Sequence, residues 1–489
     1  MKLKSLLAAS AVSLSALAIT MPAPVAAQQI TSGVEGRVAD EAGTPLAGAT
    51  VTITDTRTGQ TRTLTAGQDG EFRANTLVPG GPYTVTATAP GYEGQTVENQ
   101  YISVSGNTEY SFSLSSAAAG TENVIVVTGT RAGVVQLAVG PGSGFGQQVL
   151  DTQPTFDRDI RDIIRLDPRV SLDPDTSSGQ NRISCLGGND RSNAFTVDAI
   201  SQGDLYGLNG NGFASRSSTP IPFAAIRETS VEFAPFDVEY GQFTGCAINV
   251  ITRSGGNQFH GEAFYEYSNN DLRGDRVAGV AAAPVQPQKN WGVSLGGPII
   301  PDRLFFFGAY SHQESGESFD FGPLNGGYPN ETRGVTQADF DQVSQILRTK
   351  YGIETGPLPT SLDYNNDRYF GRLDWQITDR HRLEGTYQHL DEVTVKQGGV
   401  FTSVTSPTVT GLNNFYNSGT KSDYYSGRLY SDWTDTLSTE IRYAHSSIQD
   451  LQTPVGGGDA LSGNPTPTIN VGVINNGIAG SIQAGPDGF

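Results

Sequence analysis

The segment YFGRLDWQI, residues 369–377, indicates how the C-terminal half of this chain folds. Its Tyr369, Leu373 and Trp375 alternate with polar residues such as Arg372 and Asp374. A period of two is typical of a β-strand with one apolar face, and about ten such residues cross a bilayer as a tilted strand. The alternation recurs in FHGEAFYEY, WGVSLGG, RLEGTYQHL, YYSGRLYSDW and LSTEIRYAH, whereas RLFFFGAY is apolar on both faces.

The connections between these segments alternate between short and long. The short ones are PIIPDR, TDRH and TDTL, and the long ones span residues 268–288, 313–363 and 392–421. Outer-membrane barrels combine short periplasmic turns with long extracellular loops, a rhythm that a soluble sandwich has no reason to keep. Residues 257–489 therefore predict about seven strands of a transmembrane antiparallel β-barrel surrounded by outer-membrane lipid.

Seven strands leave an open edge, and every strand edge in lipid must be paired. Plugged outer-membrane transporters have about 22 strands. The stretch from Pro454 to Phe489 is rich in Gly and Asn, and we interpret it as a loop without strand alternation. We therefore expect the chain to be the N-terminal part of a longer protein.

The composition agrees with a β-rich protein and argues against one class of partner. The 489 residues include 60 Gly and 26 Pro, which separate short strands. Acidic residues number 50 against 31 Lys and Arg, for a formal net charge of −19. Phosphate binding needs clustered cations, so no nucleic-acid partner is expected. After the N-terminus, no apolar run is long enough to span a bilayer as a helix.

The first 27 residues have the pattern of a secretory signal peptide. Lys2 and Lys4 precede the apolar run SLLAASAVSLSALAIT, and Val25-Ala26-Ala27 supplies small residues for cleavage. The alternative is an N-terminal anchor helix, which the short length of the run disfavours. Export is therefore expected, with Gln28 as the first residue of the mature chain.

The few residues with catalytic or metal-binding character do not form a recognisable site. Cys185 and Cys246 are the only cysteines, and in an exported chain such a pair is expected to form one disulfide. His389 and Glu392 have zinc-carboxypeptidase spacing, but on a strand they point to opposite faces. GPGSGFG lacks the context of a dinucleotide loop, and DPDTSSG (173–179) is interpreted as a solvated acidic loop. We predict no catalytic residue, no cofactor and no metal site.

Residues 28–117 predict a small β-sandwich. GVEGRVA, ATVTITD, TRTLTA, EFRANTL, PYTVTATA and YSFSLS alternate between turn clusters such as GQDG and PGGP. The segments GRVADEAGTPLAGATVTITDTRTGQ and DGEFRANTLVPGGPYTVTATAPGYE resemble the carboxypeptidase regulatory-like domain, which precedes many outer-membrane receptors. This resemblance implies an accessory sandwich of the prealbumin or carbohydrate-binding-like kind, and we find no peptidase site in it.

A linker, residues 118–131, contains NVIVVTGTR. We interpret its apolar and β-branched run as one exposed, unpaired strand, a template on which a partner strand can add. The string resembles the VVTGTR start of TonB-dependent receptors, which implies a TonB box. The alternative is the first strand of the next domain. The candidate box residues are Val124, Ile125, Val126, Val127, Thr128 and Gly129.

Residues 132–256 resemble the α+β plug domain of TonB-dependent receptors. FDRDIRDIIRLDP predicts one helix that ends at Pro168. FTVDA matches a plug strand, with Ala199 where Gly is usual. The segment from Pro235 to Tyr267 resembles the last plug strands and first barrel strand of the Oar-like receptors. A bridge between Cys185 and Cys246 would then pin two plug strands.

The resemblance implies a mainly β protein with four parts: signal peptide, small β-sandwich, α+β plug and the first strands of a barrel. It implies a TonB-dependent receptor in the outer membrane of a Gram-negative bacterium. Such a receptor pairs with TonB in the periplasm and takes up an extracellular ligand, here unidentified. The alternatives are a surface adhesin, whose sandwich binds a carbohydrate or peptide without transport, and a soluble secreted β-protein.

Overall fold

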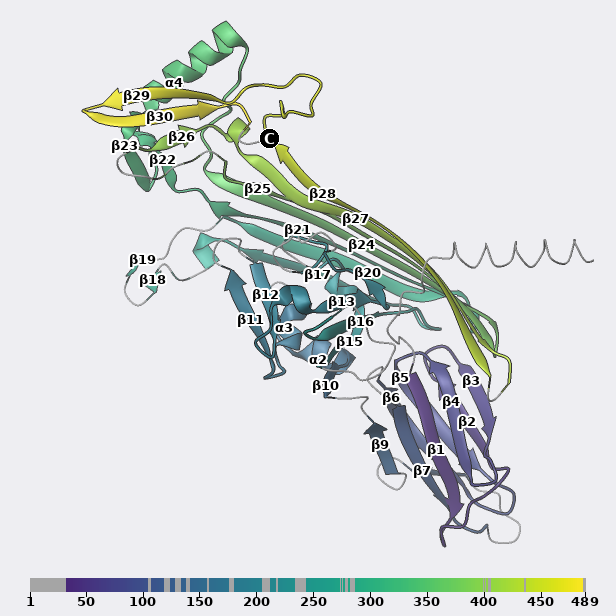
Figure 1. Cartoon of the computed structure of the whole chain (residues 1–489). Helices are drawn as coiled ribbons and strands as arrows, with labels where there is room; N and C mark the ends of the chain where they lie inside the picture. The colour runs from purple at the N-terminus through teal and green to yellow at the C-terminus, as the bar shows by residue number, and fades with distance from the viewer. Residues whose placement is uncertain are drawn as a thin grey trace, which may run out of the picture.

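The computed structural model describes most of residues 32–486 and consists mainly of β-strands, which confirms the predicted fold class. Figure 1 shows a sandwich at one end, a plug beside a long β-wall, and a cap of loops at the other end. No helix in the described part is both long and apolar enough to cross a membrane. The predicted signal peptide, residues 1–27, lies outside the described residues. The gaps are 104–106, 118–123, 128–132, 138–140, 156–157, 176–179, 205–211, 217–218, 234–242, 273, 275, 278–279, 282–285, 399, 401, 403–405 and 435–436.

The N-terminal sandwich consists of two facing sheets. Alternate residues of strands such as β2 (Thr50–Asp55) and β5 (Gly80–Thr88) point inward, and Val51, Val85, Tyr110 and Phe112 are buried between the sheets. Strand β6 was not predicted, because VENQ interrupts its apolar alternation with polar residues. One sheet has the order β4 (Glu71–Leu77), β1 (Ser32–Asp40), β7 (Asn107–Leu114), β9 (Gly133–Leu137), and the other β3 (Gln60–Thr65), β2 (Thr50–Asp55), β5 (Gly80–Thr88), β6 (Gly94–Ile102), β8 (Val124–Val127).

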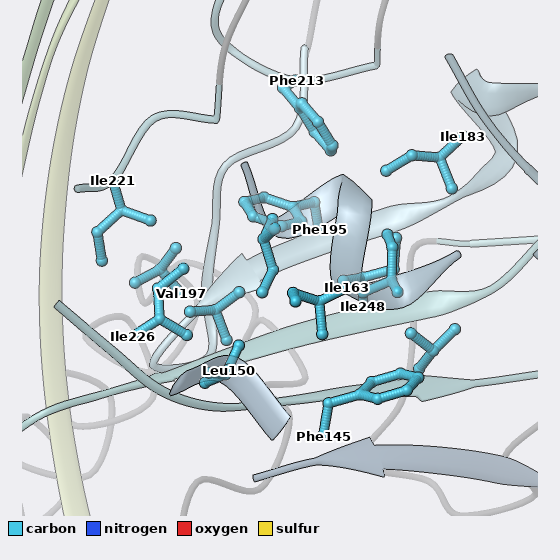
Figure 2. Close-up of a cluster of buried hydrophobic side chains, with 14 of the residues drawn as sticks. Phe145, Leu150, Ile163, Ile183, Phe195, Val197, Phe213, Ile221, Ile226 and Ile248 are labelled. Atoms are coloured by element: carbon cyan, nitrogen blue, oxygen red, sulfur yellow. The ribbon is translucent and has the colours of Figure 1, made fainter. Parts of the chain in front are cut away.

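The plug is a five-stranded sheet with short helices. Figure 2 shows its core, where Phe145, Ile163 and Phe195 lie among buried aliphatic side chains. The predicted helix is only five residues long and begins after Asp159, whose side chain accepts a hydrogen bond from the backbone N–H of Arg161. The sheet order is β10 (Gly142–Phe145), β15 (Ile226–Glu232), β16 (Ala247–Thr252), β13 (Ala194–Val197), β14 (Ile200–Ser201), with the hairpin β11 (Val170–Asp175) and β12 (Gln180–Cys185), and helices α2 (Gln147–Thr152) and α3 (Ile160–Ile164).

The FTVDA motif forms strand β13 and the turn that follows it. Asp198 and Ala199 join β13 to β14 with φ angles of 46° and 56°. Two successive positive φ angles are typical of the type I′ hairpin turn, which favours Asn, Asp and Gly. The turn therefore keeps its shape with Ala199 in place of the usual Gly, at a conformational cost.

The β-wall is one antiparallel sheet of seven strands. Its outward side chains Leu373 and Trp375 are 50% and 46% exposed, whereas the inward Arg372 and Asp374 are 5% and 6% exposed. The alternation in residues 369–377 thus separates an outer apolar face from an inner face against the plug. The strands, in order, are β17 (His260–Ser268), β20 (Gln288–Ile300), β21 (Leu304–Ser318), β24 (Ser361–Thr378), β25 (His381–Lys396), β27 (Tyr416–Asp432) and β28 (Ser438–Pro454).

The long connections are shorter than predicted because polar residues continue the strand pairing beyond the apolar band. β21 and β24 pair as far as Ser318 and Ser361, inside the predicted gap 313–363. What remains of the loops packs around Val335, Phe340, Val409 and Ile482 as a separate cap. The cap contains β22 (Phe321–Leu324), β23 (Asn330–Thr336), α4 (Gln337–Ile346), β26 (Thr408–Thr410), β29 (Ile469–Asn475) and β30 (Ile478–Ala484), and a further short pair is β18 (Arg276–Val277) with β19 (Val280–Ala281).

The interpretation of residues 454–489 as a loop without strands is wrong. Strands β29 and β30 form an antiparallel hairpin in which Asn475 pairs with Ile478. The turn residues Asn476 and Gly477 have φ angles of 50° and 78°. Asn-Gly is a strong signal for such a turn, and it was overlooked in a segment dominated by Gly and Asn.

Candidate functional site

The inner face of the wall carries a buried group of charged side chains. The strand register places Asp374 opposite Glu384, and Glu384 opposite Arg428. Arg372 lies two residues before Asp374, so the period of two puts it on the same face. All four side chains are buried where the wall meets the plug.

Two arginines of the wall share one glutamate. Arg428 Nη1 donates to Glu384 Oε1 at 2.7 Å, and Arg372 Nη2 donates to Glu384 Oε2 at 2.9 Å. Arg372 also binds both carboxylate oxygens of Asp374, through Nε and Nη2, at 2.8 Å each. Such two-pronged contacts fix the guanidinium groups in one orientation.

The remaining donors of these arginines bind the plug. Arg372 Nη1 donates to Thr252 Oγ1 of strand β16 at 3.0 Å. Thr252 in turn donates to Asp198, from its hydroxyl at 2.7 Å and from its backbone N–H at 3.0 Å. Arg428 Nη2 donates to the backbone carbonyl of Asp198. We call the six residues Asp198, Thr252, Arg372, Asp374, Glu384 and Arg428 the plug–wall cluster.

The plug–wall cluster holds three carboxylates against two guanidinium groups, away from water. Burial raises the pKa of Asp198 above its usual range, although Arg372 favours its charged form. Buried ion pairs add little net stability when complete, but removing one partner leaves a buried charge and costs several kcal/mol. The cluster therefore helps to hold the plug in one position on the wall.

Sequence reasoning missed the plug–wall cluster, although part of its signal was visible. Arg372, Asp374, Glu384 and Arg428 are charged residues at inward positions of consecutive predicted strands. Burying a charged side chain costs free energy unless it is paired, so charged residues at inward positions indicate a contact with partner residues. Their partner Asp198 was not predictable, because it lies more than 170 positions away from Arg372 in the chain.

The candidate TonB-box strand is found in an unexpected place. Residues Val124–Val127 form β8, which pairs in parallel with β6 of the sandwich. The prediction of an unpaired strand is therefore wrong, because the open edge of β6 offers backbone partners to the linker. Thr128 and Gly129 lie outside the described residues.

The two cysteines meet within the plug. Cys185 and Cys246 form a disulfide with an S–S distance of 2.02 Å and a Cα–Cα distance of 5.9 Å. Cys185 ends strand β12, and Cys246 directly precedes strand β16. The bond ties the β11–β12 hairpin to the plug sheet, and both cysteines are buried in the plug core.

The residues with zinc-site spacing do not converge. His389 Nδ1 lies 2.8 Å from Asp423 Oδ1 on the outer side of the wall, whereas Glu392 faces inward and accepts from the backbone N–H of Arg216. Across the described residues, no group of three or more His, Cys, Asp or Glu side chains is placed to hold a metal ion. Residues 176–179 of DPDTSSG lie outside the described part.

The sandwich is attached to the wall at its short turns. Gln60 Nε2 donates to the backbone carbonyl of Asp302 at 2.7 Å, in the turn between β20 and β21. Arg62 forms an ion pair with Asp432 at 2.7 Å, at the end of β27. Asn257 donates to the carbonyl of Thr58 at 2.9 Å. These contacts are polar, as contacts between domains of one chain often are.

Two segments match described protein families. Residues 33–115 match the carboxypeptidase regulatory-like domain, and residues 251–318 match the outer membrane beta barrel domain. Over 150 residues the chain is 27% identical to the TonB-dependent transporter Oar of Myxococcus xanthus. This match covers 29% of this chain and 13% of the length of Oar. These matches confirm the predicted location in the outer membrane of a Gram-negative bacterium.

The chain also matches solved structures over part of its length. The outer membrane transporter YddB from Escherichia coli matches 65% of this chain and 40% of its own length, at 14% identity and a TM-score of 0.47. The siderophore receptor PirA from Acinetobacter baumannii matches 67% of this chain and 42% of its own length, at 17% identity and a TM-score of 0.44. The chain thus spans about two fifths of each of these structures.

Proposed function

We propose that this chain, a homologue of the TonB-dependent transporter Oar with a carboxypeptidase regulatory-like domain and an outer-membrane β-barrel domain, takes up a ligand with energy delivered by TonB. The observation that carries this proposal is the plug–wall cluster. Through Arg372 and Arg428 it contributes a buried, polar part of the contact between plug and wall, which also includes other pairs such as Gln388 with Gln202. The hydrogen bonds and charge attractions of such a contact are stronger in the buried, low-dielectric interior than in water, so they weaken once water enters.

In this proposal, ligand binds at the extracellular loops and the exposed face of the plug. TonB pairs with the strand Val124–Val127, and its pull reaches the plug sheet, whose first strand begins at Gly142. Displacing β16 separates Thr252 from Arg372, and water then replaces the broken hydrogen bonds. No covalent bond is made or broken, so the activity is transport and not enzymatic.

We also propose domain boundaries, in which strand β9 (Gly133–Leu137) is the part of the plug segment that pairs with the sandwich. They are a signal peptide at 1–27, a sandwich at 28–117, a linker with the box at 118–131, a plug at 132–256 and a partial barrel at 257–489. The partners in this scheme are TonB, outer-membrane lipid and an unidentified extracellular ligand.

Growth of receptor variants on nutrients tests the proposal. Proline at position 125 removes a backbone N–H that strand pairing needs, so Ile125→Pro should abolish growth on nutrients that the deletion strain cannot use. Val135→Pro, in the neighbouring strand β9, is the matched control and should retain growth. If Ile125→Pro grows normally and removing residues 30–115 abolishes adhesion, the adhesin replaces the receptor.

A further inference from the structure

The candidate box strand already belongs to a sheet. β8 pairs in parallel with β6 over four positions, Gly94 with Val124 through Val97 with Val127. It is the last strand in the order β3-β2-β5-β6-β8, and no other described strand pairs along its second edge. A sheet edge of this kind carries unpaired N–H and C=O groups that accept a further strand.

The two strands that follow β7 in the chain, β8 and β9, each pair with a different sheet of the sandwich. β9 pairs antiparallel with β7, from Asn107 with Leu137 to Ser111 with Gly133. β9 thereby extends the sheet that contains β1, β4 and β7, whereas β8 extends the sheet that contains β2, β3, β5 and β6. Two separate strands that follow the sandwich in the chain, β8 and β9, thus each pair with an edge strand of one of its sheets.

β8 lies at the end of the sandwich that points away from the plug. The opposite end of β6 adjoins the plug, where Ser103 donates to Glu228 and Arg227 donates to the carbonyl of Pro79 at 3.0 Å. β8 pairs with the first four residues of β6, which precede Ile102 by five to eight positions. At about 3.3 Å per residue, this places β8 roughly 15–25 Å further from the plug. Figure 1 shows that the sandwich extends away from the plug and the wall.

We propose that the sandwich presents β8 to TonB as an edge strand, so that a TonB strand adds to the second edge of β8 and continues the sheet. This inference rests on the proposed function, because it concerns the same box. It differs from capture of a free segment, in which TonB would have to order the box on binding. A strand fixed in advance avoids that entropic cost.

The proposal also gives the accessory sandwich a function. Because β8 shares a sheet with β5 and β6, a pull on β8 is transmitted to the sandwich and its polar contacts with Asp302 and Asp432. The sandwich then moves with the box when TonB pulls. A model in which TonB takes the place of β6 predicts the opposite, that the box must leave the sandwich first.

A disulfide lock separates these two cases. Thr96 and Val126 are register partners, and paired residues of a parallel ladder point to the same face with Cα atoms within disulfide range. The full-length receptor carrying Thr96→Cys and Val126→Cys is purified in detergent, and the bond is detected by mass spectrometry. The control pair, Thr96→Cys with Ile125→Cys, is out of register and should form no bond.

Binding of the purified periplasmic C-terminal domain of TonB is then measured with oxidised and reduced receptor. We expect the locked receptor to bind within about twofold of the reduced one. Loss of binding by tenfold or more on oxidation, restored by reductant, overturns the proposal. Failure of the in-register pair to cross-link also overturns it. The wild-type receptor is measured in both states, because reductant also opens the native disulfide. If the wild type binds in neither state, the proposed function itself fails.

Discussion

Replacing Arg428 with Met is the sharpest test of the plug–wall cluster. The substitution keeps most of the side-chain length but deletes the hydrogen bonds to Glu384 and to the carbonyl of Asp198. The substitution leaves three carboxylates in the cluster with only one guanidinium group, that of Arg372. Breaking a buried pair typically costs 3–5 kcal/mol, and because Arg372 still binds Glu384 we expect about 3 kcal/mol.

The cost is measured as the stability of the plug inside the receptor. Amide hydrogen exchange of strands β13 and β16 is followed against urea concentration, since both strands belong to the plug sheet. With a slope of about 2 kcal/mol per molar urea, a loss of about 3 kcal/mol lowers the midpoint by about 1.5 M. The exchange of wall strands should change much less.

Arg442→Met is the matched control. Arg442 pairs with Glu440 at 2.6 Å on the neighbouring strand β28, and their side chains are 18% and 28% exposed. Partly exposed pairs contribute roughly 0–1 kcal/mol, so the midpoint should fall by less than about 0.5 M. Equal shifts for the two variants would refute the role assigned to the cluster.

Three further predictions concern the plug. Ala199→Gly should raise the urea midpoint slightly, because relief of a positive φ gains about 1–2 kcal/mol while the lost methyl costs about 0.8 kcal/mol. Changing Cys185 and Cys246 to Ser should destabilise the plug by up to about 4 kcal/mol, since the bond closes a loop of 61 positions; an unchanged midpoint would contradict this. Hydrogen bonds from Arg169, at 2.7 and 3.0 Å, hold the pKa of Asp167 below its usual range. Asp167 should therefore stabilise the plug at neutral pH and lose this effect as the pH falls below about 4, and Asp167→Asn should flatten that dependence.

Local patterns were sufficient to predict the wall and most of the sandwich. A period of two is a property of each strand, so segments such as 369–377 can be recognised without knowledge of their neighbours. The strand ends were harder, because polar residues such as those near Ser318 continue the ladder after the apolar signal has stopped. The β29–β30 hairpin was missed because its Asn-Gly turn lies among many other Gly and Asn residues.

The contacts that matter for function depend on pairs of distant segments. The meeting of Asp198 with Arg372 and Arg428 requires the plug to be seated against the wall, which no local pattern reports. The pairing of β8 with β6 likewise depends on which sandwich edge is open. An apolar strand flanked by a polar linker has the same sequence whether it is free or docked.

Cross-linking between the box strand and TonB in intact cells tests whether this strand connects the receptor to TonB. A receptor carrying Val126→Cys is expressed with TonB variants that bear single cysteines along their pairing strand. We predict a disulfide-linked adduct that disappears when Ile125→Pro is added. Absence of an adduct from cysteines at each of positions 124–127 would contradict the claim that this strand connects the receptor to TonB.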